Sequence, residues 1–264
     1  MLGSVFAKWL WDARRSVLGW TLAIAVVGGF YTAMWPTVNS PELQATLDSY
    51  PQALLEAINF IEISTAAGYL SASVYGLIVA VLMVVYAVSA GTRTIASDEV
   101  AGTLDLILAH PVSRSRLALQ RFASFLLSVV IIVGALWLVM LALAGPAQLD
   151  GISVGQFAAM HLHLVLFGAF FGAVTYAAGA ATGRKSWAIG SGAGLAVIGY
   201  ATNGIIPQAE GWERVRNLSP FHWLNGNNPL HTGVQIGDAF LMLALTAALI
   251  AAGTWIFNRR DVAV

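Results

Sequence analysis

The sequence predicts an all-α membrane protein with six transmembrane helices. Of its 264 residues, 58% are hydrophobic and 10% are charged, and the mean hydropathy is +0.75. A helix needs about 20 consecutive, mostly apolar residues to cross a bilayer. Such runs occur at residues 17–35, 70–91, 117–144, 157–182, 186–206 and 238–257, and the centre of each lacks Asp, Glu, Lys and Arg. We therefore expect residues 1–264 to form a single transmembrane domain.

The basic residues predict that both chain termini are cytoplasmic. In that orientation, every Lys and Arg except Arg214 and Arg216 faces the inside, and residues 36–69, the first outer segment, contain no basic residue. Cytoplasmic loops of membrane proteins carry such an excess of Lys and Arg. The first apolar run begins after two arginines and is too long for a signal peptide, so we expect it to direct its own insertion.

Residues 1–15, before the first span, have the pattern of an amphipathic interfacial helix. Val5, Phe6 and Trp9 can share an apolar side, with Lys8 and Arg14 toward the lipid headgroups. A basic flank that only sets the orientation explains the same residues equally well. Both interpretations stay open.

Residues 94–116 form a polar break between the second and third spans. We expect Ser97 to cap a short helix, with Asp98 and Glu99 at its positive N-terminal end. Apolar residues then recur at helical spacing: Val100, Leu104, Ile107 and Leu108. Pro111 discourages further helix. Such a helix is expected to dock a cytoplasmic partner, although its leucines could also rest on lipid headgroups.

Two outer segments are expected to cap the bundle. Residues 36–69 have a helical composition, and residues 207–237 are polar, proline-bearing and aromatic, with Asn-Gly-Asn-Asn-Pro at 225–229. Turn residues of this kind predict short interfacial helices or a lid. In the fourth span, Gly168 and Gly172 have the four-residue spacing that lets helices pack closely, within the bundle or between protomers.

The polar break resembles the cytoplasmic motif of ABC-2 type transporter permeases. It reads Glu99-x-x-Gly102-Thr103-Leu104-x-x-x-Leu108-x-x-Pro111-Val112-Ser113-Arg114 and enters a span at Leu117. The resemblance extends along the chain to Leu218-Ser219-Pro220-Phe221 and Arg259-Arg260-Asp261. In that family this segment is the coupling helix, which inserts into a cleft of the ATP-binding subunit. We call residues 94–116 the coupling segment.

The resemblance implies which residues make the contact with the ATP-binding subunit. They are Glu99, Gly102, Thr103, Leu104, Leu108 and Pro111. One departure from the family is Arg121, which stands where a lysine is frequent at the start of the following helix. Because arginine can hold two acceptors at once, the exchange is not neutral for a bidentate contact.

The resemblance further implies the permease subunit of an ATP-driven exporter in the plasma membrane of a prokaryote. The sequence has no G-x-x-x-x-G-K-[ST] loop, so we expect ATP and Mg²⁺ to bind separate ATPase subunits. The expected unit contains two ATPases and a second permease protomer, identical or homologous. This chain itself is expected to be no enzyme and to bind no cofactor. Apolar spans favour a hydrophobic or amphipathic substrate, and zero net charge disfavours nucleic acid.

A secondary transporter or channel is the first alternative, but it would normally need acidic groups near the midplane, and these spans offer only hydroxyls. An intramembrane enzyme is the second. Ser191 lacks the G-x-S-x-G spacing because Ile189 takes the first position. His161 and His163 would point to different sides of a helix. His222 and His231 make an outer cluster conceivable. Cysteine is absent, which excludes thiolate sites.

Overall fold

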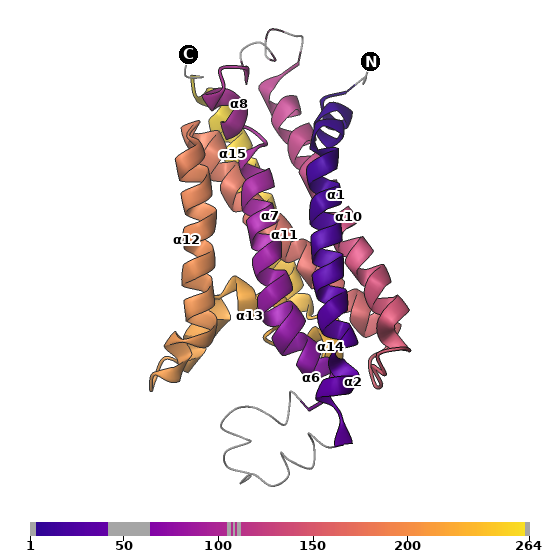
Figure 1. Cartoon of the computed structure of the whole chain (residues 1–264). Coiled ribbons are helices and arrows are strands. Elements are labelled where there is room, and N and C mark those ends of the chain that lie inside the picture. Colours follow the sequence, from indigo (N-terminus) through magenta and orange to yellow (C-terminus); the bar gives the residue numbers. More distant parts are fainter. Residues whose placement is uncertain (1–3, 42–63, 105–106, 108, 110–111, 262–264) are drawn as a thin grey trace.

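A computed structural model describes residues 4–41, 64–104, 107, 109 and 112–261 of the chain. Within these residues, six helical segments are long and apolar enough to cross a membrane, and they lie side by side in one bundle (Figure 1). The first three segments are α1 (Val5–Ala33) with α2 (Trp35–Val38), α6 (Ala66–Tyr69) with η1 (Leu70–Ile78) and α7 (Val79–Thr92), and α10 (Arg114–Ala144). The last three are α11 (Val154–Thr182), α12 (Lys185–Gly204) with η2 (Ile206–Gln208), and α15 (Ile236–Arg259). The predicted all-α class and the six spans are confirmed.

The expected interfacial helix at residues 1–15 is not a separate element. Ser4 caps α1 by accepting a hydrogen bond from the backbone N–H of Ala7 (3.2 Å), and the helix then continues without interruption to Ala33. The stretch from Val5 to Arg15 contains neither glycine nor proline, and helix propagation needs no new nucleus. The structure therefore shows one extended first helix in place of an interfacial helix followed by a span.

Helix α11 is the centre of the bundle and packs against α7, α10, α12 and α15. Two of its glycines, Gly168 and Gly172, are buried against neighbouring helices. A Cβ atom added at Gly172 would lie 2.2 Å from the ring of Phe125, and one at Gly168 would lie 2.9 Å from Met83 Sδ. The predicted close packing of this glycine pair is therefore internal to the bundle. Helix α12 is the least buried span.

The predicted short helices in residues 207–237 are confirmed. They are η3 (Glu213–Leu218), α13 (Pro220–Asn225) and α14 (Pro229–Thr232), and they lie at the end of the bundle opposite to α8 (Ala96–Val100) (Figure 1). The side chains of Phe221 and Leu230 are buried in the core, so α13 and α14 pack into the bundle, whereas η3 contributes no buried residue. Most of residues 36–69, the other expected cap, lies outside the described residues.

Two asparagines of the Asn-Gly-Asn-Asn-Pro stretch fasten this region to η1, which is a π-helix. The Asn225 side chain donates a hydrogen bond to the backbone carbonyl of Ser71 (2.7 Å), and the Ser71 hydroxyl donates to Asn228 Oδ1 (2.8 Å). π-Helical turns are rare and are frequently found at functional sites. The contact holds the second span to the segment that precedes the sixth.

Replacing Asn225 by alanine should lower the melting temperature of the purified protein. A partly buried hydrogen bond to a backbone carbonyl is lost, and its net contribution is about 1 kcal/mol, or roughly 2–4 °C for a chain of this size. Asn227→Ala is the control, because Asn227 makes an exposed hydrogen bond to Asp238. Equal shifts for the two variants would contradict the fastening role of Asn225.

Candidate functional site

The coupling segment lies at the end of the bundle where α1 begins and α15 ends (Figure 1). We call this the α8 end. Helix α8 starts at Ala96, and Ile95 stands in the N-cap position without a side-chain cap. The predicted capping role of Ser97 is wrong, because Ser97 lies inside the first turn and a cap must precede it. The Ser97 hydroxyl instead points back to the carbonyl of Thr92 (3.5 Å).

The amphipathic helix predicted through Leu108 is interrupted after Val100. Gly102 has a φ of +67°, in the left-handed region that favours glycine. The backbone N–H of Gly102 donates to the carbonyl of Glu99 (3.0 Å), and that of Thr103 donates to the carbonyl of Asp98 (3.0 Å). These two hydrogen bonds form a Schellman motif, which ends a helix and reverses the chain direction.

This turn places residues that are four apart on opposite sides of the segment. Val100 is 64% exposed, whereas Leu104 is 1% exposed and belongs to the hydrophobic core. Gly102 and Thr103 are exposed. We call residues 100–103 the exposed turn. Helical periodicity groups Val100 with the buried leucine, whereas the structure exposes Val100. Gly102 is the signal in the sequence for a helix end at this point.

Of the six predicted contact residues, the structure therefore brings two, Gly102 and Thr103, onto the exposed turn. Leu104 faces the core, and Glu99 is buried at the base of the segment. Leu108 and Pro111 lie outside the described residues.

Asp98 joins the segment to the third span. Its Oδ2 atom lies 2.5 Å from an Nη atom of Arg121, which is buried on α10. The other Nη of Arg121 donates to the backbone carbonyl of Thr94 (2.8 Å). One guanidinium thus holds two points of the segment at once, which a lysine ammonium cannot do with the same fixed geometry.

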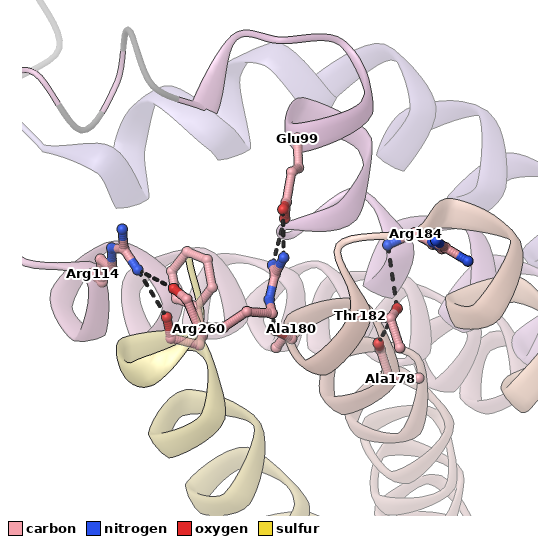
Figure 2. Close-up of polar contacts among 8 residues, drawn as sticks. Glu99, Arg114, Ala178, Ala180, Thr182, Arg184 and Arg260 are labelled. Carbon is pink, nitrogen blue, oxygen red and sulfur yellow. Dashed lines mark hydrogen bonds and ion pairs between the residues drawn. The ribbon is translucent and has the colours of Figure 1, made fainter. Parts of the chain in front are cut away.

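Glu99 pairs with Arg260, which follows the last residue of α15. Figure 2 shows the two side chains facing each other, and both carboxylate oxygens of Glu99 lie 2.6 Å from the two Nη atoms of Arg260. Only 2% of the Glu99 side chain is exposed. The sequence indicated an acidic residue at a helix N-terminus; the structure shows a buried ion pair between residues 161 positions apart.

The two histidines of α11 that were considered for an enzyme are held by separate neighbours. His161 donates from Nδ1 to the carbonyl of Phe157 (2.7 Å), and His163 donates from Nδ1 to the carbonyl of Trp223 (2.9 Å). The Nε2 atom of His163 also accepts from the backbone N–H of Gln235 (3.1 Å). Among the residues that the structure describes, no group of three or more His, Asp or Glu side chains could hold a metal ion.

Comparison with known proteins identifies the family. The family model described as "ABC-2 family transporter protein" matches residues 4–262, and a comparison with curated proteins finds no match. Membrane proteins of this family are transporter components that work with ABC ATP-binding subunits and are not themselves catalytic. The match favours the permease interpretation over the secondary transporter, the channel and the enzyme. The chain thus belongs to the ABC-2 transporter family and is a multi-pass permease of ABC type.

Proposed function

We propose that this permease is the membrane subunit of an ATP-driven exporter and that the exposed turn docks on its ATP-binding subunit. The observation that supports this most strongly is the contrast within the coupling segment. Its base is held by two ion pairs, to Arg121 and Arg260, while its tip presents the exposed apolar side chain of Val100. A turn that is held at its base and exposes an apolar side chain beyond the spans can be received by a complementary pocket of a partner, with little ordering left to be done on binding.

The proposed working unit contains two permease protomers, identical or homologous, and two ATPases that bind ATP and Mg²⁺. ATP binding draws the ATPases together, and each displaces the exposed turn seated on it. The unit lies in the plasma membrane of a prokaryote with both termini in the cytoplasm. Two observations support this orientation: the basic residues gather at the α8 end, and the start of α1 and the end of α15 lie beside α8 (Figure 1).

The substrate that we propose is hydrophobic or amphipathic. A groove of about 390 Å³ is lined by residues of α7 and α12. Its walls are mainly aliphatic, including Val84, Val88 and Ile189, and its lining also includes Arg93 and Lys185 near the α8 end. An apolar groove with two cations at one end suits an amphiphile with an anionic group better than a bare ion.

Val100→Asp tests the docking of the exposed turn. A carboxylate in the centre of an apolar contact should weaken ATPase binding tenfold or more, about 1.4 kcal/mol or above. The measurement is co-purification of the ATP-binding subunit in mild detergent, together with the ATPase rate of the complex. Val154→Asp is the control, because Val154 is equally exposed but begins α11 at the opposite end of the bundle. Normal binding by Val100→Asp would contradict the assignment.

A further inference from the structure

We propose that Glu99 and Arg260 are a positioning pair that ties the coupling segment to the ends of α11 and α15. A displacement of the exposed turn is then passed to these two spans, and not only to α7 and α10, which flank the segment in sequence. The part of this inference that concerns nucleotide-driven movement rests on the proposed function. The link itself is a property of the isolated chain.

The pair has the geometry of a strong, directional contact. Both oxygens of Glu99 meet both Nη atoms of Arg260 at 2.6 Å, and bidentate contacts of this kind fix orientation as well as distance. Water has little access, since the side chains of Glu99 and Arg260 are only 2% and 19% exposed. Removing Arg260 would take two charge-assisted hydrogen bonds away from a buried carboxylate, which is costly in a site with so little water.

Arg260 also extends the link to α11. Its Nε atom donates to the backbone carbonyl of Ala180 (3.1 Å) in the last turn of α11 (Figure 2). Gly183, which follows α11, lies directly beneath the pair: a Cβ there would be 2.4 Å from Glu99 Oε1 and 2.6 Å from an Nη atom of Arg260. Gly183 also has a φ of +68°. The absence of a side chain at Gly183 thus leaves the space that the Glu99–Arg260 pair occupies at the end of α11.

A second residue of the coupling segment, Arg114, also contacts Arg260. Arg114, at the start of α10, donates from Nη1 to the backbone carbonyl of Arg260 (2.5 Å) (Figure 2). The first and last named residues of the family-like motif, Glu99 and Arg114, therefore hold one residue between them. Glu99 binds the side chain of Arg260, and Arg114 binds the backbone carbonyl of Arg260.

These contacts define how a displacement of the coupling segment would be transmitted to the spans. Asp98 is tied to α10, while the neighbouring Glu99 is tied to α11 and α15. A short helix fixed through two adjacent acidic residues to three spans cannot shift without moving their ends. Arg260 is in this sense the point where the sixth span receives the displacement.

Hydrogen exchange of the isolated full-length chain tests the link. In Arg260→Gln, the amides of residues 96–101 should exchange at least tenfold faster than in the wild type, although the substitution lies 161 positions from Glu99. Arg259→Gln is the matched control, because Arg259 is an exposed neighbour that stacks on Trp255. The double variant Glu99→Arg with Arg260→Glu restores a pair of opposite charges and should recover most of the protection.

Two results in the isolated chain would overturn the link. One is faster exchange confined to the end of α15, with residues 96–101 unchanged. The other is an equal effect of Arg259→Gln. Should Arg260→Gln fail to accumulate, Gly183→Ala provides the second perturbation, because it displaces the pair without removing a charge. Hydrogen exchange should then become faster both in residues 96–101 and at the end of α15.

The complex with the ATP-binding subunit tests the movement. A fluorophore on Trp255→Cys, one turn before the end of α15, should change its emission when ATP is added to the wild-type background. The change should be lost in Arg260→Gln while the ATPase subunit still co-purifies, and it should return in the charge-swapped variant. A retained change in Arg260→Gln would overturn the proposed path. Failure of the wild type to bind any ATPase would instead refute the proposed function, and the exchange result would stand on its own.

Discussion

Gly91→Val is expected to lower the melting temperature of the purified protein by about 6–12 °C. A Cβ at Gly91 would lie 2.1 Å from Thr175 Oγ1, 2.9 Å from the carbonyl oxygen of Gly172 and 3.1 Å from its Cα. The last two atoms belong to the backbone of α11 and cannot rotate away, so α7 and α11 must separate. Overpacking of this kind costs about 3 kcal/mol, which corresponds to the stated shift in a chain of this size.

Gly190→Val is the control for this experiment. Gly190 lies in α12, and a Cβ there meets no atom within 4 Å. The same change of residue type should therefore leave the melting temperature within about 2 °C of the wild type, since surface substitutions rarely exceed 0.5 kcal/mol. A large shift at Gly190 with none at Gly91 would contradict the close approach of α7 and α11.

Arg121→Glu is expected to destabilise the protein about as much as Gly91→Val does. The substitution removes the hydrogen bond to the carbonyl of Thr94 and sets a second carboxylate against Asp98 in a buried position. Breaking a fully buried ion pair costs about 3–5 kcal/mol. Because 32% of the Asp98 side chain is exposed, we expect a cost at the lower end of this range, to which the like charge adds. We expect a much lower yield of folded protein and loss of ATPase binding, measured by size-exclusion chromatography and co-purification.

Two further variants separate the charge from the geometry at this position. Arg121→Lys keeps the charge but not the two fixed donors, so it should lie between the wild type and Arg121→Glu in stability. Arg116→Glu changes an exposed arginine on the same helix and should behave as the wild type in the folding assay. Equal damage by Arg116→Glu would show that the effect is one of charge distribution and not of the Asp98 contact.

The fold could be predicted from the sequence because the bilayer leaves few choices. A spanning segment must satisfy its own backbone and present about 20 apolar residues, so composition alone places α7, α10, α11, α12 and α15. The start of the first helix could not be predicted in the same way, and among the described residues the separate interfacial helix that was expected is absent. Residues 5–15 are amphipathic, yet nothing in them stops a helix, and α1 runs through.

The coupling segment shows where local pattern reading fails. Its position, its polarity and its resemblance to the family motif could be recognised, but a single left-handed residue, Gly102, changes which side chains face outward. Periodicity assumes an unbroken helix. It therefore grouped Val100 with Leu104, which the Schellman turn places on opposite sides.

The ion-pair partners of Asp98 and Glu99 could not be predicted from the sequence. Asp98 and Glu99 suit a helix N-terminus, and that local explanation is sufficient without a structure. Their partners, Arg121 and Arg260, lie in distant parts of the chain and become visible only when the spans are packed. The sequence indicates for Arg260 only its place in the Arg259-Arg260-Asp261 ending.

Site-specific cross-linking from the exposed turn tests the central claim most directly. The chain has no cysteine, so Val100→Cys carries the only thiol and can be labelled with a photoactivatable maleimide in native membranes. We predict a cross-linked product that contains the ATP-binding subunit, and no such product from the same label at Val154→Cys. If the label at residue 100 reacts only with lipid or with this chain while the Val154 label captures an ATPase, the exposed turn is not the docking site.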